Sequence, residues 1–389
     1  MKVVHVLEAL EGGTARHVSD VVRHIEGVTH HVVVPHHRVG GITDWRAVPD
    51  MRAAGAEIHR VEMRRLPVSP RNASALAELR SLLKRVRPDV VHGHSSIGGA
   101  LGRTAAADLN VLRVYTPNGL HPAAAAGLIE RALRPLTDHF VAVSQSEAIV
   151  ALARGFTDAP RLAVIPNGIE LDGTGPEAAG APADGSGGSG RSPVDLRRLL
   201  GVPPNVRLVG FIGRFASQKA PEVVVEVAAA LHARHPDVHV AMIGSGRHER
   251  HVRRLVSELG LDDTIHLVPY LARAARVMSE LDVFLLPSRY EGCPYTVLEA
   301  MRVGTPVVVS DAVGNRDLVT DGVTGRVARV GDGAATAEAL GDVLSDPAAA
   351  RTMAEAARRQ LAPHHDVRVM AGAVRAIYEG AVSAASPVA

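Results

Sequence analysis

Residues 286–306 contain two glutamates, Glu291 and Glu299, in a segment rich in glycine and proline, LPSRYEGCPYTVLEAMRVGTP. A strand is expected to end at Pro287, and a short helix that contains Glu299 is expected to end at Gly304. A carboxylate can accept two hydrogen bonds from a sugar diol, and the backbone amides of the loop and the helix start can bind an anionic or hydroxyl-rich ligand. Two solvated glutamates explain so constrained a loop poorly, so the segment favours a binding site.

Two cations, Arg214 and Lys219, flank a second loop, FIGRFASQKAP, at residues 211–221. Pro221 suits the first position of a helix, and both cations can reach one pyrophosphate whose charge rises as a leaving group departs. Solvation alone would also explain an arginine and a lysine beside a turn. The two interpretations are balanced on this segment, and the presence of only two other lysines in the chain supports a phosphate site.

A pair of glycines, Gly12 and Gly13, lies in the segment EGGTARH after the first expected strand. Such a pair lets the backbone approach a ligand, and a helix N-terminus favours an anion. A tight turn between strand and helix is the simpler interpretation of this segment alone. Neither this segment nor GSGRHE at residues 244–249 has the three glycines of the dinucleotide fingerprint, which argues against a nicotinamide enzyme.

Short valine-rich runs alternate with helix-like stretches, which predicts parallel α/β sheets wrapped by helices. The first series of expected strands is 2–7, 30–34, 57–61, 89–93, 112–116, 139–144 and 162–165. The second series is 206–212, 238–243, 264–268, 283–286, 306–310 and 325–330. Two Rossmann-like, doubly wound domains that face each other across a cleft fit this pattern, with ligand sites at the carboxyl ends of the strands.

The expected domain boundaries follow from composition. Residues 1–170 form the N-terminal Rossmann-like domain, and residues 204–362 form the C-terminal one, closed by helical sequence at 334–361. Residues 171–203 form a linker rich in glycine, proline and serine, which is too poor in large apolar residues to order itself. Residues 363–389 contain an apolar-periodic helix at 367–382 that no strand follows, and this helix is expected to pack back on the N-terminal domain.

Charge and cysteine content narrow the class of protein. The formal net charge of +2 is far from the basic excess of a dedicated nucleic-acid binder, so no nucleic acid is expected as a partner. The single cysteine, Cys293, excludes an intrachain disulfide, and no apolar run is long enough to span a membrane or serve as a signal peptide, so a cytoplasmic location is expected. Basic residues at 64–87 face apolar leucines, which indicates a helix packed on a sheet; the alternative is peripheral contact with anionic lipid at the inner face of a membrane.

Four segments together resemble the retaining GT-B glycosyltransferases of family 4 over nearly the whole chain. They are EGCPYTVLEAM with its Glu291-x7-Glu299 spacing, GRFASQK, VIPNG at residues 164–168 and GGTARH near the start. Stretches such as PDVVHGHSSIGGALGR and VYTPNGLHP are most similar to bacterial members that build polysaccharides, glycolipids and glycosylated natural products. The resemblance implies a GT-B fold whose N-terminal domain binds the acceptor and whose C-terminal domain binds the nucleotide sugar.

The resemblance also implies roles for individual residues. Arg214 and Lys219 match the cations on the donor diphosphate, and Glu291 matches the carboxylate on the transferred sugar, which makes these three the implied catalytic residues. Glu299 matches the carboxylate on the nucleotide ribose. The other implied donor-binding residues are Gly213, Gly244, Tyr270, Gly292, Cys293, Pro294, Tyr295, Thr296, Val297 and Leu298. The implied residues on the side of the acceptor and phosphate are Gly12, Gly13, Arg16, His94, Asn118 and His121.

One position departs from the family pattern. Family members commonly have a histidine near the reacting sugar in the sequence Thr-Pro-His-Gly, whereas this chain has Asn118 in TPNG. An asparagine forms hydrogen bonds but cannot serve as a titrating acid or base, and His94 or His121 would be the partial substitute. The departing phosphate is thought to assist the incoming hydroxyl in retaining members, so the loss of this imidazole does not by itself exclude turnover.

No metal or cofactor is expected. The chain has no Asp-x-Asp triplet, so the metal-dependent GT-A arrangement has no ligand set, and the pairs His36-His37 and His364-His365 lack the spacing of a zinc site and are interpreted as surface residues. The sequence thus predicts a metal-independent, retaining glycosyltransferase that moves a sugar from a nucleoside diphosphate donor, most often a UDP-sugar in such relatives, to an acceptor hydroxyl. The alternatives are a sugar-nucleotide 2-epimerase of the same fold and a non-catalytic sugar-nucleotide binder.

Overall fold

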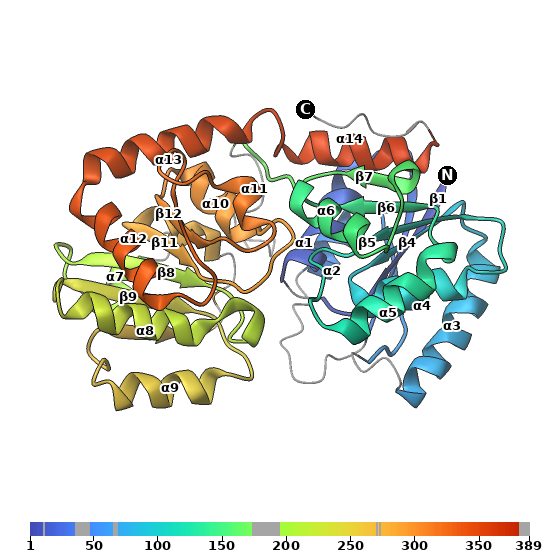
Figure 1. Cartoon of the computed structure of the whole chain (residues 1–389). Helices are drawn as coiled ribbons and strands as arrows, with labels where there is room; N and C mark the ends of the chain where they lie inside the picture. Colours follow the sequence, from blue (N-terminus) through green and yellow to red (C-terminus); the bar gives the residue numbers. More distant parts are fainter. Residues whose placement is uncertain are drawn as a thin grey trace, which may run out of the picture. The chain divides into compact units, whose positions relative to one another are not determined.

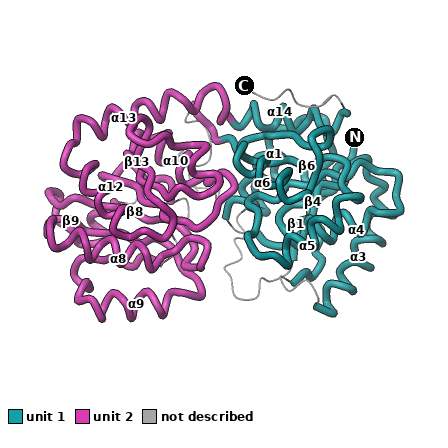
Figure 2. The backbone as a smooth tube through the Cα atoms, viewed as in Figure 1, with its two compact units in different colours: residues 1–168, 367–389 teal, residues 169–366 magenta. Residues whose placement is uncertain are grey.

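A computed structural model describes residues 1–10, 12–35, 47–64, 69–172, 195–269, 271 and 274–380. The chain divides into two compact units, shown in Figures 1 and 2. Unit 1 comprises Met1–Gly168 and Val367–Ala389, and unit 2 comprises Ile169–Asp366. Each unit is a Rossmann-like α/β unit with one parallel sheet, as expected for the class.

Unit 1 has a seven-stranded parallel sheet with the order β3-β2-β1-β4-β5-β6-β7. Its strands are β1 (Lys2–Leu7), β2 (Thr29–Val34), β3 (Glu57–Arg60), β4 (Val90–His94), β5 (Leu112–Thr116), β6 (His139–Ala142) and β7 (Leu162–Val164). The strand order reverses at β1, which has β2 on one side and β4 on the other. In sheets of this kind ligands bind outside the carboxyl ends of the strands at such a switch point.

The helices of unit 1 cover both faces of its sheet. They are α1 (Gly12–His24), α2 (Ala47–Ala53), α3 (Pro70–Val86), α4 (Ser96–Ala105), α5 (Ala124–Leu133), α6 (Gln145–Ala153) and α14 (Val367–Tyr378), with 3₁₀ turns η1 (Arg134–Leu136) and η2 (Ala159–Arg161). Because side chains alternate along a strand, Val3 packs in one cluster with α1 and α14, whereas Val4 packs in another with Leu79 of α3. One face of the C-terminal helix therefore packs into the core of unit 1, and the helix lies along the outside of that unit (Figure 1).

Helix α3 contains most of the basic stretch that admitted two interpretations. Its residues Leu79, Leu82 and Leu83 are buried in the same cluster as valines of β1 and β4, and Arg80 forms an exposed ion pair with Asp108 at 2.9 Å. This confirms a helix packed on the sheet. Within the described residues no helix has the length and apolar character that crossing a membrane requires.

Unit 2 has a six-stranded parallel sheet with the order β10-β9-β8-β11-β12-β13. The strands are β8 (Arg207–Ile212), β9 (Val238–Ile243), β10 (Ile265–Val268), β11 (Val283–Leu286), β12 (Val307–Ser310) and β13 (Arg326–Ala328). The helical elements are α7 (Leu196–Leu200), η3 (Ser217–Lys219), α8 (Pro221–His232), α9 (Glu249–Glu258), η4 (Ala274–Glu280), α10 (Tyr295–Val303), α11 (Asn315–Leu318), α12 (Gly333–Ser345) and α13 (Pro347–Leu361). The switch point is at β8, between β9 and β11.

All thirteen expected strands are present, and the differences concern helices. The helical sequence 334–361 forms two helices, because Pro347 begins α13 and the Asp346 side chain accepts hydrogen bonds from the N–H groups of Ala348 and Ala349. The last part of the expected linker is ordered: α7 is capped by Asp195, and the N–H of Leu196 donates to Glu280 Oε2 at 2.7 Å. Residues 173–194 of that linker lie outside the described residues.

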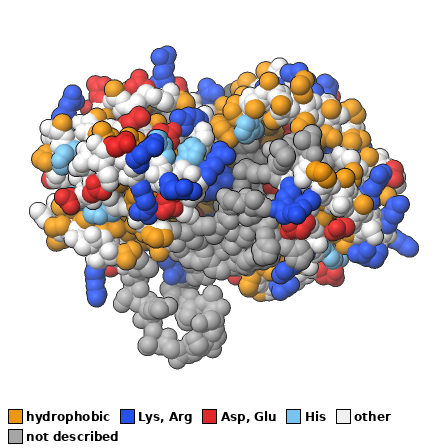
Figure 3. Space-filling view, turned by 90° about the horizontal axis from the view of Figure 1, so that it is seen from below, with side chains coloured by type: hydrophobic (Ala, Val, Ile, Leu, Met, Phe, Trp, Pro, Cys, Tyr) orange, Lys and Arg blue, Asp and Glu red, His pale blue; other side chains and the backbone are white. Residues whose placement is uncertain are grey.

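The near-balance of charges is visible on the surface. On the face drawn in Figure 3, basic and acidic side chains are interspersed over the described part of the chain. Over the described residues of this face, such a distribution gives no extended field of one sign to attract a polyanion.

Candidate functional site

The two charged loops of unit 2 meet at its switch point. Lys219 ends η3, which follows β8, and Glu291 follows β11, the strand next to β8 in the sheet. The Lys219 Nζ atom lies 2.6 Å from Glu291 Oε1, and the two side chains are 15% and 7% exposed. The sheet order thus brings together a cation and a carboxylate that are far apart in the sequence, as the resemblance implies.

Hydrogen bonds to Gln218 fix the two loops relative to each other. The side-chain amide of Gln218 donates to the backbone carbonyl of Tyr290 at 3.1 Å, and the backbone carbonyl of Gln218 accepts the N–H of Arg289 at 2.8 Å. Arg214, the second implied phosphate ligand, donates from Nη2 to Gln218 Oε1 at 3.3 Å. Gln218 and Arg289 were not among the residues named from the sequence. Their role depends on the pairing of β8 with β11, which brings the two loops together and which neither motif reveals by itself.

Arg289 adds a second ion pair to this edge of the sheet. Its Nη2 atom lies 2.7 Å from Glu222 Oε1, in the first turn of α8, and its Nη1 atom donates to the carbonyl of Ser217 at 2.7 Å. Arg289 is 40% exposed, so this pair contributes little to stability, about 0–1 kcal/mol. Its main effect is to hold η3 and the start of α8 against the loop that follows β11.

Two glycines permit close backbone contacts around the site. A Cβ atom on Gly244, where φ is +147°, would lie 2.0 Å from the carbonyl oxygen of Gly213. A Cβ atom on Gly314, where φ is +84°, would lie 2.1 Å from the carbonyl oxygen of Gly292, next to Glu291. Any side chain at these positions would therefore displace the loops that carry the charged residues.

Helix α10 begins directly after the Glu291 loop. Tyr295 and Glu299 of this helix are each 7% exposed, Cys293 is 5% exposed, and Thr296 has a buried Oγ1 with no hydrogen-bond partner in the structure. A helix start such as that of α10 stabilises nearby negative charge, because the first N–H groups of a helix have no partner four residues earlier in the helix. Pro294 precedes the helix as its N-cap residue.

Two residues named from the sequence lie in the core of unit 2. Val297 and Leu298 are completely buried, and their N–H groups both donate to the carbonyl of Pro294, at 3.1 and 3.3 Å. They anchor α10 in the core of unit 2 and offer no polar group to a ligand in this structure. Tyr270 lies outside the described residues.

The glycine turn of unit 1 follows β1 at the switch point of that sheet. Gly12 is the first residue of α1 and has φ of +60°, which favours glycine, and Gly13 is exposed. Arg16 does not extend from the turn: its Nε atom lies 2.9 Å from Asp20 Oδ2, one turn along α1. Burial raises the pKa of the Asp20 carboxyl, and the nearby guanidinium of Arg16 opposes that rise. Arg16 thus stabilises a buried carboxylate.

His94 ends β4 and Asn118 follows the neighbouring strand β5, whereas His121 lies farther along the chain and is exposed. His94 ends β4 and is paired in register with Thr116, the last residue of β5. Asn118 has φ of +54°, and its amide donates to the carbonyl of Thr116 at 3.2 Å, while its Oδ1 atom is buried with no partner in the structure. His121 is exposed and accepts the N–H of Ala123 at 3.1 Å.

The interior of unit 1 contains histidines that the sequence analysis did not single out. His5, His17 and His92 are fully buried together with His94 on the side of the sheet covered by α1 and α14. The interpretation of the histidine pairs as surface residues is wrong for His365, which is 8% exposed, and His36-His37 lies outside the described residues. The signal was present, because His92 and His94 are two residues apart in a strand and so share a face.

Comparisons with known proteins identify the family of the chain. Residues 195–360 match the family model described as glycosyl transferases group 1, and residues 11–172 match that of glycosyltransferase family 4. A D-inositol 3-phosphate glycosyltransferase of Salinispora arenicola is 30% identical over 77% of this chain and 70% of the relative. The UDP-Gal:alpha-D-GlcNAc-diphosphoundecaprenol alpha-1,3-galactosyltransferase of Escherichia coli is 27% identical over 69% of this chain and 70% of the relative.

Solved structures show the same fold. The crystal structure of Anabaena HepE in complex with UDP and glucose superimposes with a TM-score of 0.80 at 18% identity, covering 98% of this chain and 100% of that one. Sucrose-phosphate synthase from Thermosynechococcus elongatus gives a TM-score of 0.80 at 20% identity, covering 98% of each chain. Two Rossmann-like units, each with a parallel sheet, and charged loops at the switch point of the second unit define a glycosyltransferase of the GT-B fold. The chain belongs to glycosyltransferase family 4.

Replacement of Gly314 by alanine tests the close contact at the Glu291 loop. Gly314→Ala is expected to cost about 1–2 kcal/mol for the positive φ and about 1–3 kcal/mol more for the clash with Gly292. Gly322→Ala is the matched control, because Gly322 has φ of +71° but no atom within 4 Å of its Cβ position. Urea unfolding of both variants measures the difference, and equal losses of free energy would contradict the proposed contact.

The burial of His17 predicts a dependence of stability on pH. Desolvation lowers the pKa of His17 from 6.5 to about 4, although its hydrogen bond with Asn167 opposes this shift. The unfolded state binds this proton first, so the free energy of unfolding falls as pH decreases from 6.5 to about 4, by about 3 kcal/mol for this group. Urea unfolding across this range should show a smaller loss for His17→Asn than for the wild-type protein; identical profiles would refute the assignment.

Proposed function

We propose that this glycosyltransferase transfers a sugar from a UDP-sugar to an acceptor hydroxyl, with retention of the anomeric configuration and without a metal ion at the donor phosphates. The observation that carries the proposal is the 2.6 Å pair of Lys219 and Glu291 at the switch point of unit 2. A sugar nucleotide has a diphosphate directly next to a sugar rich in hydroxyl groups. A cation directly next to a carboxylate is complementary to both parts at once.

Each group has bonding capacity beyond the pair. The ammonium group of Lys219 has three donors, so it can bind a phosphate oxygen while it still contacts Glu291. The carboxylate of Glu291 has further lone pairs that can accept sugar hydroxyls. Arg214 would share the diphosphate with Lys219, and Glu299 would bind the ribose. As the glycosidic bond breaks, charge increases on the phosphate, and the two cations stabilise it in place of a metal ion.

The names of similar proteins support this choice of donor and acceptor. The relative from Escherichia coli is named as a transferase of galactose from UDP-Gal to a lipid-linked sugar, and the HepE structure contains UDP and glucose. The relative from Salinispora arenicola is named for an inositol phosphate acceptor. The names of these three proteins are consistent with transfer of a sugar to a hydroxyl in the biosynthesis of a polysaccharide, a glycolipid or a natural-product glycoside.

Release of nucleoside diphosphate from a panel of UDP-, GDP-, ADP- and TDP-sugars tests the proposal. We expect release from a UDP-sugar that EDTA does not change, and a glycoside whose anomeric proton coupling in NMR matches that of the donor. Inversion at the anomeric carbon would refute the retaining mechanism. Binding of a donor without release in a broad acceptor panel would favour a sugar-nucleotide binder, and conversion of the donor into its 2-epimer would favour an epimerase.

Two substitutions test the ion pair itself. Lys219→Ala and Glu291→Gln are each expected to reduce the rate of transfer by about 10²-fold or more, because each removes a group that contacts the reacting part of the donor. Lys84→Ala is the matched control, since Lys84 is exposed on α3 in unit 1. Rates are compared at saturating donor, and circular dichroism verifies the fold. Full activity of Lys219→Ala would rule out the assigned role.

A further inference from the structure

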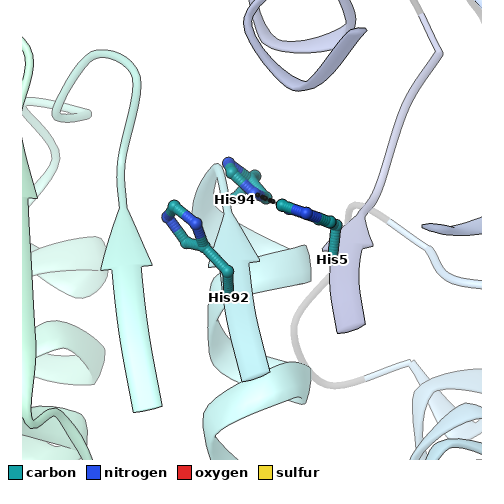
Figure 4. Close-up of side chains that lie close together, drawn as sticks. All are labelled: His5, His92 and His94. Atoms are coloured by element: carbon teal, nitrogen blue, oxygen red, sulfur yellow. Dashed lines mark hydrogen bonds between the residues drawn. The ribbon is translucent and has the colours of Figure 1, made fainter. Parts of the chain in front are cut away.

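Three histidines lie together inside unit 1, and no step of the proposed transfer uses them as a group. Figure 4 shows His5 on β1 and His92 and His94 on β4, with the ring of His5 directed at that of His94. All three are 0% exposed, and one nitrogen from each lies within 4.8 Å of the others. His5 is paired in register with His92, so the two strands hold the three rings on one face of the sheet.

A chain of hydrogen bonds determines which nitrogen of His94 carries its proton. The carbonyl of Ile25 can only accept, so His30 donates to it from Nε2 at 3.4 Å and must accept at Nδ1. His5 therefore donates from Nε2 to His30 Nδ1 at 3.0 Å and accepts at its own Nδ1. His94 must then donate from Nε2 to His5 Nδ1 at 3.1 Å, which leaves a bare lone pair on His94 Nδ1.

This assignment requires neutral rings, and burial provides them. Desolvation lowers the pKa of His5 and His94 well below 6.5 and lowers that of His30 in the same direction. A neutral imidazole is also the form that binds a metal ion.

His17 presents a second bare lone pair beside the first. Its Nδ1 atom faces the carbonyl oxygen of the Asn167 side chain at 3.1 Å and so donates, which makes Nε2 an acceptor. His94 Nδ1 and His17 Nε2 are both buried, and neither has a hydrogen-bond partner in the structure. The ring centroids of His17 and His94 are 5.6 Å apart, close to the 5.4 Å of the hydrogen-bonded pair His5 and His94. Each of these two neighbouring rings therefore contains an unsatisfied acceptor, at a cost of about 1–3 kcal/mol each.

We propose that His5, His92 and His94 bind a divalent transition-metal ion of the zinc class. The ion takes the place of the proton between His5 Nδ1 and His94 Nε2, and that proton moves to His94 Nδ1. His94 Nδ1 then carries a proton in place of its bare lone pair, and it becomes a donor on the ring that neighbours the bare acceptor of His17. Each ring keeps one proton and supplies one lone pair, and no proton leaves the site.

The surrounding hydrogen bonds already suit bound ligands. With its Nδ1 on the ion, His5 still donates from Nε2 to His30, which in turn donates to Ile25, the type of outer contact that orients metal-binding histidines. His92 has a partner at each nitrogen, Tyr378 Oη at 2.6 Å and Thr116 Oγ1 at 2.8 Å, and keeps one of them when the other nitrogen binds. For one of its nitrogens to bind the ion, the ring of His92 turns toward His5 Nδ1 and His94 Nε2.

The geometry and the ligand chemistry favour zinc over magnesium or calcium. The 3.1 Å between His5 Nδ1 and His94 Nε2 is near the separation of about 3.3 Å that bonds of 2.0–2.1 Å give in a tetrahedral site. Three imidazoles suit Zn²⁺, Co²⁺, Ni²⁺ and Cu²⁺, whereas Mg²⁺ and Ca²⁺ take oxygen ligands. Bound between β1 and β4, the ion would join two strands of the sheet and stabilise the folded state.

A second group of potential ligands provides an internal control. His31, Glu57 and His59 also lie close together, but Glu57 is 63% exposed and His59 is 25% exposed. A solvated carboxylate at the sheet edge holds an ion weakly. The double variant His31→Gln/His59→Gln removes this group and leaves the buried one intact.

Metal uptake by the full chain, purified without a histidine tag and stripped with a chelator, tests the proposal. We expect one tightly bound Zn²⁺ per chain after dialysis, a rise in Tm, and intense visible absorption from four-coordinate Co²⁺. The control variant His31→Gln/His59→Gln should behave like the wild-type protein, whereas His94→Gln and His5→Gln should lose the Co²⁺ spectrum. No uptake by the wild-type protein, or an unchanged Co²⁺ spectrum in His94→Gln, would overturn the proposal.

A substitution at His17 separates a metal site from a structural cluster. His17→Leu removes the acceptor on the ring that neighbours His94 but no ligand, so one ion should still bind, with an affinity about 10- to 100-fold lower. The wild-type Co²⁺ spectrum remains decisive if a ligand variant does not fold. These readouts are independent of sugar transfer, so failure of the metal site and failure of the proposed function are distinguishable.

Discussion

In each unit the strand order reverses beside one strand, β1 in unit 1 and β8 in unit 2, and the polar groups that can act on a ligand lie around these two strands. The connections on either side of such a strand cross to opposite faces of the sheet, so no helix covers the carboxyl end between them. The Lys219–Glu291 pair follows β8 and its neighbour β11. The three buried histidines come from β1 and its neighbour β4. One topological constraint thus positions both groups.

The two groups differ in how they satisfy their buried polar atoms. Lys219 and Glu291 neutralise each other across 2.6 Å, and the remaining lone pairs and protons stay available to a ligand. In unit 1, Arg103 is 1% exposed and is satisfied within the core by Glu130 at 2.8 Å. The buried histidines resemble neither case, because His94 Nδ1 and His17 Nε2 are acceptors without donors. Native interiors rarely retain such atoms unless an ion, a water molecule or a ligand completes them.

Glycines allow the backbones of the loops of unit 2 to approach one another too closely for any side chain to fit between them. Gly244 and Gly314 both have positive φ, and a methyl group on either would overlap a backbone carbonyl at about 2 Å. The loops are therefore held by close backbone contacts together with the side chains of Gln218 and Arg289. Rigid backbone support matters at such a site because small displacements of charged groups weaken transition-state stabilisation considerably.

The sequence by itself determined the strands, the two-unit class and the family, because these depend on local periodicity and on short segments such as EGCPYTVLEAM. It also identified Lys219 and Glu291 as candidate site residues, each through its own motif. The tertiary structure alone decided that Gln218 and Arg289 join the two loops and that Val297 and Leu298 lie in the core. The division of the helical segment 334–361 at Asp346 has a local signal in the sequence, an aspartate followed by a proline. The histidine cluster depends on strand order and register, which pair β1 with β4 across more than eighty residues. A contact between distant segments leaves no local pattern, and burial arises only when the helices cover the sheet.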